Sequence, residues 1–172
     1  MKHRWLAAVF FIFLSLPLPA HAQAERASAV VSRVIDGDTV VLDNKEHVRL
    51  LGINAPEYEL WKPYVEPYGK EAAEYLRSRL KGKKVLLEGD QETKDRYGRT
   101  LAYVYLSDGT FVNEELVRGG YAQARYYAPN GKYYAKLKAA QKEARDAERG
   151  LWKEKLKNKK SRDLVDNFAQ KV

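Results

Sequence analysis

The sequence contains no cysteine, which excludes disulfide bonds and thiolate metal sites. The fold must therefore be held by packing alone or with help from a bound ligand. Histidine is scarce as well, and His47 has no second His or Cys at ligand spacing, so we assign it no catalytic or zinc role. Acidic residues are outnumbered, 23 Asp and Glu against 31 Lys and Arg, for a net charge of +8. A basic chain suits polyanionic partners such as nucleic acid or anionic lipid, although net charge is also a common solubility device.

The N-terminus has the organisation of a secretory signal peptide. The basic residues 2–4 precede an apolar run over residues 5–16, and residues 20–22 read Ala-His-Ala, with small side chains at the two positions that a signal peptidase reads. An uncleaved anchor is the alternative, but about twelve helical residues span only about 18 Å of a ~30 Å hydrocarbon core. We expect a signal peptide over residues 1–22. The protein is then secreted, periplasmic or extracellular, without stable membrane insertion after cleavage.

Five strands are predicted after the signal peptide, because short runs rich in Val, Ile, Leu and Tyr alternate with turn residues. They cover residues 29–35, 39–42, 47–53, 84–88 and 99–106. Asp36-Gly37 joins the first two strands and is a hairpin signal, since glycine accepts the positive φ that such turns need. The first three strands should form a meander.

Three helices are predicted over residues 68–80, 111–118 and 131–149. The first and third have apolar residues at helical spacing, namely Ala72, Leu76 and Leu80, then Tyr133, Leu137, Ala140, Ala144 and Ala147. The second stops at Gly119-Gly120, where glycine can adopt the left-handed conformation that ends helices. Strands first and helices afterwards indicate one α+β domain, which we place at residues 23–152.

A basic segment follows the predicted domain. Residues 153–162 hold six basic residues and one acid. We interpret residues 153–172 as a basic C-terminal tail, either a solvated end or a nonspecific phosphate-binding arm.

Several residues have the chemistry that phosphodiester cleavage needs, which is positive charge at the phosphoryl oxygens and a group that presents water. Asp38 follows a turn where its carboxylate can act as a hard oxygen ligand, although Asp-Gly alone is ordinary turn chemistry. Arg49 lies in an apolar strand and must reach a carboxylate, a ligand or the barrel surface. Glu57 leaves that strand after Pro56 and could contact a metal-bound water, while Arg99 begins the last strand as either a functional or a structural arginine.

These residues occur in four ordered motifs, IDGDTV, VRLLGINAPE, DRYGRTLAYVY and DGTFVNEELVRGGYA. In this order and spacing, residues 29–152 closely resemble the staphylococcal nuclease (thermonuclease) family. The resemblance implies a five-stranded OB-fold β-barrel with three α-helices. It further implies a Ca²⁺-dependent endonuclease that hydrolyses DNA and RNA with little sequence specificity and leaves 3′-phosphate ends. We expect a monomer.

The resemblance assigns roles to the matching catalytic positions. Arg49 would clamp the scissile phosphate, and Glu57 would orient or deprotonate the attacking water. Arg99 would stabilise the charge that develops on the phosphate and assist the leaving oxygen.

The metal site implied by the resemblance contains one departure. Asp38 and the backbone carbonyl of Ala55 match calcium ligands of the family, but Asn54 stands where the family has a second aspartate. The amide still offers a carbonyl oxygen, with one negative charge fewer. We therefore expect an active enzyme with a raised calcium requirement.

Substrate contacts are predicted where basic and aromatic residues alternate, since such surfaces follow a phosphate backbone and stack on bases. The candidates are Tyr121, Arg125, Tyr126 and Tyr127. In the family a tyrosine pair ahead of a Pro-Asn turn lines the nucleotide pocket; Tyr127 matches one member, and Arg125 falls at the other. Arg96 matches a phosphate-contacting position, or is a solvated loop cation. The loop over residues 58–67 could cover the site as a flap or pack on the barrel.

Two other functions remain open from the sequence. OB-folds also bind oligonucleotides without chemistry, and Asn54 could mark a site that has lost its metal, which gives a single-strand-binding module. A surface-adhesive protein that uses its basic tail is the other, but it leaves the set of Asp38, Arg49, Glu57 and Arg99 unexplained.

Overall fold

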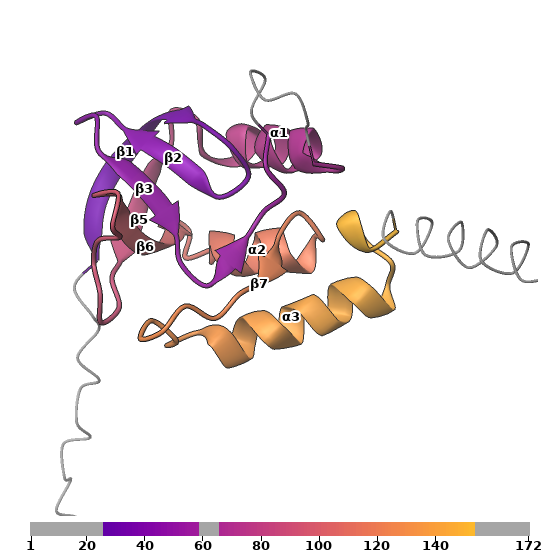
Figure 1. The fold of residues 1–172 in the computed structure, drawn as a ribbon. Helices are drawn as coiled ribbons and strands as arrows, with labels where there is room; N and C mark the ends of the chain where they lie inside the picture. Colours follow the sequence, from indigo (N-terminus) through magenta and orange to yellow (C-terminus); the bar gives the residue numbers. More distant parts are fainter. Residues whose placement is uncertain (1–25, 59–65, 154–172) are drawn as a thin grey trace, which may run out of the picture.

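The computed structural model describes residues 26–58 and 66–153 (Figure 1). The predicted signal peptide, all of the predicted tail beyond Lys153 and most of the predicted flap lie outside these residues. None of the helices in the described ranges is both long and apolar enough to cross a membrane.

Five strands form a closed barrel in the order β1-β2-β3-β6-β5, with β3 and β6 parallel and the other neighbours antiparallel. Their bounds are Ala27–Val34 (β1), Thr39–Leu42 (β2), His47–Leu50 (β3), Lys84–Glu88 (β5) and Thr100–Leu106 (β6). Val31, Val48 and Val85 are fully buried inside, because alternate strand residues face the barrel axis. The predicted meander and the five-stranded barrel of an α+β domain are confirmed.

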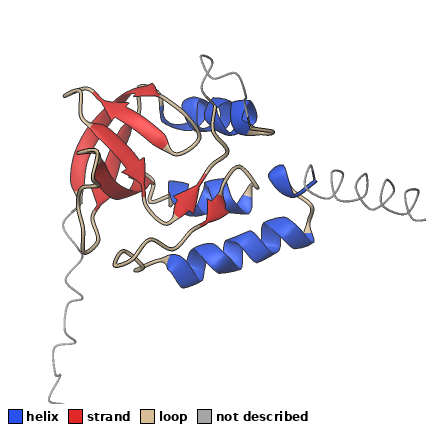
Figure 2. Ribbon diagram, viewed as in Figure 1, coloured by secondary structure: helices blue, strands red, loops and turns tan. Residues whose placement is uncertain are grey.

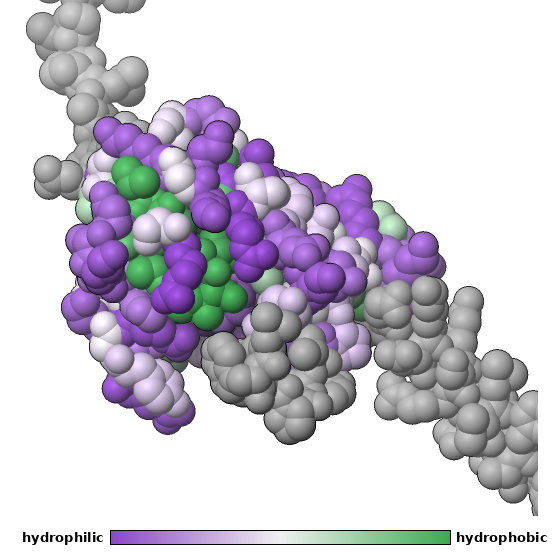
Figure 3. Space-filling view, turned by 90° about the horizontal axis from the view of Figure 1, so that it is seen from above, coloured by the Kyte–Doolittle hydropathy of each residue, from purple (hydrophilic) through white to green (hydrophobic). Residues whose placement is uncertain are grey.

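Helices cover the barrel on two sides (Figure 2). α1 (Gly69–Leu80) packs on β1 through Ala72, Leu76 and Leu80, which are fully buried, as their spacing predicts. α2 (Val112–Arg118) and α3 (Tyr134–Asp146) pack against each other below the barrel. α3 is shorter than predicted, and its apolar stripe ends at Ala144 because Ala147 is exposed. Seen from above, an apolar area at the barrel end is bordered by polar side chains (Figure 3).

The prediction of one continuous strand over residues 47–53 is wrong. β3 ends at Leu50, and β4 (Ile53–Asn54) pairs instead with β7 (Gln123–Ala124), a strand that the sequence did not predict. Gly52 makes the break, because its φ is 74° and a Cβ there would lie 2.6 Å from Leu137 Cδ1. The chain thereby leaves the barrel and carries residues 54–57 across its end.

Gly37 is required for a different reason from the one the sequence suggested. Its φ is not positive; instead, an added Cβ would lie 2.5 Å from Ala55 Cβ and 2.8 Å from Ala72 Cβ. The β1–β2 turn therefore fits tightly between the segment after β4 and α1. This close approach places Asp38 directly below Ala55.

Candidate active site

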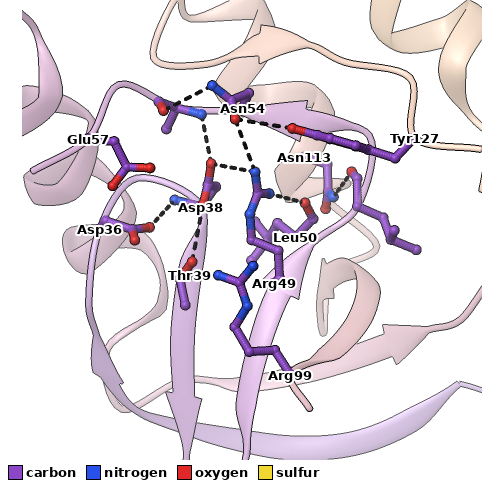
Figure 4. Close-up of polar contacts among 12 residues, drawn as sticks. Asp36, Asp38, Thr39, Arg49, Leu50, Asn54, Glu57, Arg99, Asn113 and Tyr127 are labelled. Carbon is purple, nitrogen blue, oxygen red and sulfur yellow. Dashed lines mark hydrogen bonds and ion pairs between the residues drawn. The ribbon is translucent and has the colours of Figure 1, made fainter. Parts of the chain in front are cut away.

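A pocket of about 750 Å³ opens where the β1–β2 turn, β3, the segment after β4 and the loop before β6 meet. Most of the residues singled out from the sequence line it: Asp38, Arg49, Asn54, Glu57, Arg96, Arg99 and Tyr127. Figure 4 shows that all of these except Arg96, which is not drawn, come from separate elements and point toward a common space. The pocket thus combines carboxylates, guanidinium groups and an aromatic ring.

Asp38 is the buried carboxylate of this pocket, only 6% exposed. Its Oδ2 accepts a hydrogen bond from the Ala55 N–H (2.8 Å) and pairs with Arg49 Nη2 (3.0 Å), while its Oδ1 accepts from the Thr39 hydroxyl. Burial raises the pKa of Asp38 to about 7, against the opposing effects of Arg49 and of the Ala55 N–H. Its negative charge is therefore incompletely compensated, which favours a nearby cation.

The sequence predicted that Arg49, an arginine in an apolar strand, needs a partner. In the structure its guanidinium pairs with Asp38. Nη1 also donates to the Leu50 carbonyl at 2.6 Å, and Nη2 lies 3.4 Å from Asn54 Oδ1. Asn54 Oδ1 accepts in addition from the Tyr127 hydroxyl at 3.2 Å. One network thus joins β3, β4 and the loop after β7 at the mouth of the pocket (Figure 4).

Glu57 is exposed at the rim of the pocket, beyond Pro56. Its N–H donates to a carboxylate oxygen of Glu66 at 3.2 Å. Its backbone is held against the start of α1, since a Cβ on Gly69 would lie 2.5 Å from the Glu57 carbonyl oxygen. The Glu57 side chain therefore projects from a fixed backbone toward the side of the pocket where Asp38 lies (Figure 4).

Arg99 is oriented by Asp95, a residue that the sequence analysis missed. Asp95 Oδ2 accepts from Arg99 Nε at 2.7 Å, and Oδ1 accepts from the N–H groups of Tyr97 (2.9 Å) and Arg99 (3.0 Å). Burial raises the pKa of Asp95, but the bonds with Arg99 and the Tyr97 N–H outweigh burial and leave it below its usual value. The aspartate at the start of Asp-Arg-Tyr-Gly is the turn signal that could have revealed this role.

Comparison with known proteins places the chain in a family. The family model described as "Staphylococcal nuclease homologue" matches residues 47–154. The Thermonuclease of Staphylococcus hyicus is 42% identical over 134 residues, which is 76% of this chain and 79% of that protein. The Thermonuclease of Staphylococcus intermedius is 45% identical over 128 residues, 73% and 76% of the two chains. This chain belongs to the staphylococcal nuclease family.

More distant relatives agree with this membership. Endonuclease YncB of Bacillus subtilis is 36% identical over 135 residues, which is 76% of this chain and 64% of that protein. The barrel and helices described above are those expected for a family member. The resemblance seen in the four sequence motifs is therefore confirmed.

Asp38, Asn54 and Ala55 offer the carboxylate, amide and backbone carbonyl oxygens that a hard cation such as calcium takes. The amide of Asn54 and the carbonyl of Ala55 adjoin each other, with Asn54 Nδ2 3.5 Å from the Ala55 oxygen. Within residues 26–58 and 66–153, no three His, Cys, Asp or Glu side chains form a group that could hold a metal. An ion at this position would therefore rely on the carboxylate of Asp38 and on neutral carbonyl oxygens, since Asn54 supplies no charge where the resemblance implies an aspartate.

Two further loop residues lie at the outer side of the pocket. Tyr97, which the sequence analysis did not select, is 69% exposed, and Arg96 Nη2 donates to its hydroxyl at 2.6 Å. The Arg99 guanidinium carbon lies 5.5 Å from the Tyr97 ring centroid. An exposed ring with two cations beside it forms a surface on which a base can stack near a bound phosphate.

Three of the predicted substrate residues lie outside the pocket, namely Tyr121, Arg125 and Tyr126. The Tyr121 ring stacks on that of Tyr75, with centroids 4.0 Å apart and planes at 12°, and on Tyr68 at 5.8 Å. Tyr121 is thus part of the packing between α1 and the segment after α2, outside the pocket, and its contact with substrate stays a prediction. Arg125 has an exposed side chain that does not line the pocket.

Proposed function

We propose that this protein is a secreted, monomeric, calcium-dependent nuclease that hydrolyses phosphodiester bonds of DNA and RNA and leaves 3′-phosphate ends. The observation that carries the proposal is the meeting of Asp38, Arg49, Glu57 and Arg99 in one pocket. Relatives named thermonucleases and endonucleases support the activity. The apolar N-terminal run supports secretion.

The two arginines act on the phosphate. Arg49 approaches from β3 and Arg99 from the start of β6, so their guanidinium groups can bind different phosphoryl oxygens and offset the charge that grows there. Asp38 and Asp95 hold these groups before substrate arrives, which lowers the entropy lost on binding. A calcium ion held by Asp38, Asn54 and the Ala55 carbonyl would supply further positive charge to the phosphate.

Glu57 acts on the attacking water. It is an exposed carboxylate at the pocket rim, where it can accept a proton from a water molecule positioned in line with the leaving oxygen. The close approach of its backbone to Gly69 fixes the point from which the side chain extends. As the water oxygen bonds to phosphorus, the bond from phosphorus to the 5′-oxygen breaks; Arg99 stabilises the charge on that oxygen, which takes a proton from solvent.

The aromatic residues explain low sequence specificity. Tyr97 and Tyr127 both present rings to the pocket lining, and Arg96 adds a cation for a neighbouring phosphate. Stacking and phosphate contacts accept any base, since neither reads the hydrogen-bonding edge. We therefore expect a preference for single strands or duplexes that open easily.

The test is hydrolysis of single-stranded DNA and RNA across a calcium titration, with a chelated sample alongside. Glu57→Gln is expected to lower kcat by about 10²–10⁴-fold, the usual contribution of a general base. Glu71→Gln, which neutralises an exposed glutamate on α1, is the matched control and should keep wild-type turnover. Equal turnover in Glu57→Gln and wild type would overturn the role of Glu57. Tight strand binding without cleavage at any calcium level would instead identify a binding module.

A further inference from the structure

An aromatic pair lies outside the pocket, between the loop after β7 and the start of α3. Tyr126 is 51% exposed, and its ring centroid lies 5.4 Å from that of Tyr134, with the planes at 55°. Gly131 lies against this ring, since a Cβ there would be 2.6 Å from Tyr126 Cε2. The exposed ring is therefore supported from two sides before any ligand binds.

An unpaired lysine follows this pair along α3. Lys138 is exposed and lies four residues after Tyr134, so both are on the same face of the helix. The other two lysines of α3 are neutralised: Lys136 pairs with a glutamate at 2.8 Å and Lys142 with an aspartate at 2.5 Å. In the described part of the chain, no carboxylate pairs with Lys138. Its charge is thus available to an external anion.

Arg125 adds a second available cation. Its backbone N–H donates to the Gly52 carbonyl at 2.8 Å, which fixes it beside β4, while its side chain is exposed and has no carboxylate partner within the described residues. We refer to Arg125, Tyr126, Tyr134 and Lys138 as the α3 platform. It combines two rings with two positive charges that have no carboxylate partner among residues 26–58 and 66–153.

We propose that the α3 platform is a second binding surface for single-stranded nucleic acid, and that it holds the part of a strand that extends beyond the pocket. The inference rests on the proposed function for the identity of the ligand. Tyr127 lines the pocket and the preceding Tyr126 faces α3, so the two surfaces are continuous along the chain. Bases stack on exposed rings and phosphates pair with free cations, which is the chemistry of sequence-independent strand binding.

The platform makes binding depend on strand length. Site sizes on such barrels range from about 4 to about 16 nucleotides, so we expect a strand of about 4 to stay within the pocket and one of about 16 to reach α3 as well. Tyr126→Ala is expected to raise the Kd for the longer strand by about 5- to 160-fold, the usual loss for one base stack, and to leave the Kd for the shorter strand unchanged. Tyr126→Phe keeps the ring and should bind both strands as wild type does.

The charge of the platform is tested separately. Lys138→Ala should reduce the slope of log Kd against log salt for the longer strand by about 0.7, the value for one lost phosphate contact on a single strand. Lys142→Ala removes an equal charge from the same helix, but one already paired with a carboxylate, and should leave the slope unchanged.

The measurement is fluorescence anisotropy of labelled oligothymidylates of both lengths with calcium chelated, so that binding is read without turnover. Circular dichroism checks that each variant is folded. Equal binding of the longer strand by Tyr126→Ala and wild type would overturn the platform, even if cleavage is normal. A length-dependent loss in a protein that never cleaves would support the platform and overturn the proposed catalysis.

Discussion

Replacing Asn54 with aspartate is expected to lower the calcium concentration for half-maximal hydrolysis by about tenfold, which corresponds to about 1.4 kcal/mol. Asn54 Oδ1 lies 3.4 Å from Arg49 Nη2 and 3.2 Å from the Tyr127 hydroxyl, at the mouth of the pocket next to the carboxylate of Asp38. The substitution keeps the shape of the side chain and adds one negative charge there.

The magnitude follows from opposing charges. Two unit charges about 4 Å apart interact by about 4 kcal/mol at an effective dielectric constant of about 20. A divalent cation gains more than this from the new carboxylate. Most of the gain is offset, because the carboxylate also pairs with Arg49 when calcium is absent and must lose water when it binds the ion. The net gain in calcium-binding free energy, about 1.4 kcal/mol, is the small difference between the attraction and these two costs.

The assay is hydrolysis of single-stranded DNA at a series of calcium concentrations. It is run near pH 8, because burial raises the pKa of Asp38 to about 7 and its carboxylate must be charged. Asn44→Asp is the matched control, since it makes the same substitution at an exposed residue of the β2–β3 turn, outside the pocket lining. An equal midpoint in Asn54→Asp and wild type, or an equal shift in the control, would refute the assignment of Asn54 to the calcium site.

Two stability predictions concern residues that join the barrel to the helices. Glu88 is 2% exposed and accepts from Lys132 (2.5 Å) and the Tyr133 hydroxyl (2.8 Å). Burial raises the pKa of Glu88, but its hydrogen bonds outweigh burial and leave the pKa below the usual 4.5. Charged Glu88 therefore stabilises the folded state above about pH 4.5. This stabilisation is lost as the pH falls through the lowered pKa. Glu88→Gln should therefore destabilise by about 3 kcal/mol in urea at pH 7 and by much less in acid; an equal loss at both would contradict this. Asn113→Ala should cost about 2–4 kcal/mol and lower kcat, because it strands the Leu51 carbonyl that Asn113 Nδ2 binds at 2.8 Å; urea unfolding and turnover measure it, and unchanged stability would refute it.

The sequence determined most of the elements, apart from β4 and β7, and most of the chemistry. Strand and helix positions followed from local periodicity, as the burial of Leu76 and Leu80 on one face of α1 illustrates. Asp38, Arg49 and Arg99 could be selected because ordered motifs carry them, and such motifs are readable without a structure. Their meeting in one pocket follows once the barrel order is known.

Only the tertiary structure decided the features that depend on contacts between distant residues. Local signals could not show that position 37 has no room for a side chain. Ala55 and Ala72 come close to it only in the folded barrel. Tyr121 has the same side chain as Tyr127, yet it packs on Tyr75 while Tyr127 reaches the pocket. A side chain's chemistry is local, but its partners are set by which surfaces the packed elements leave open.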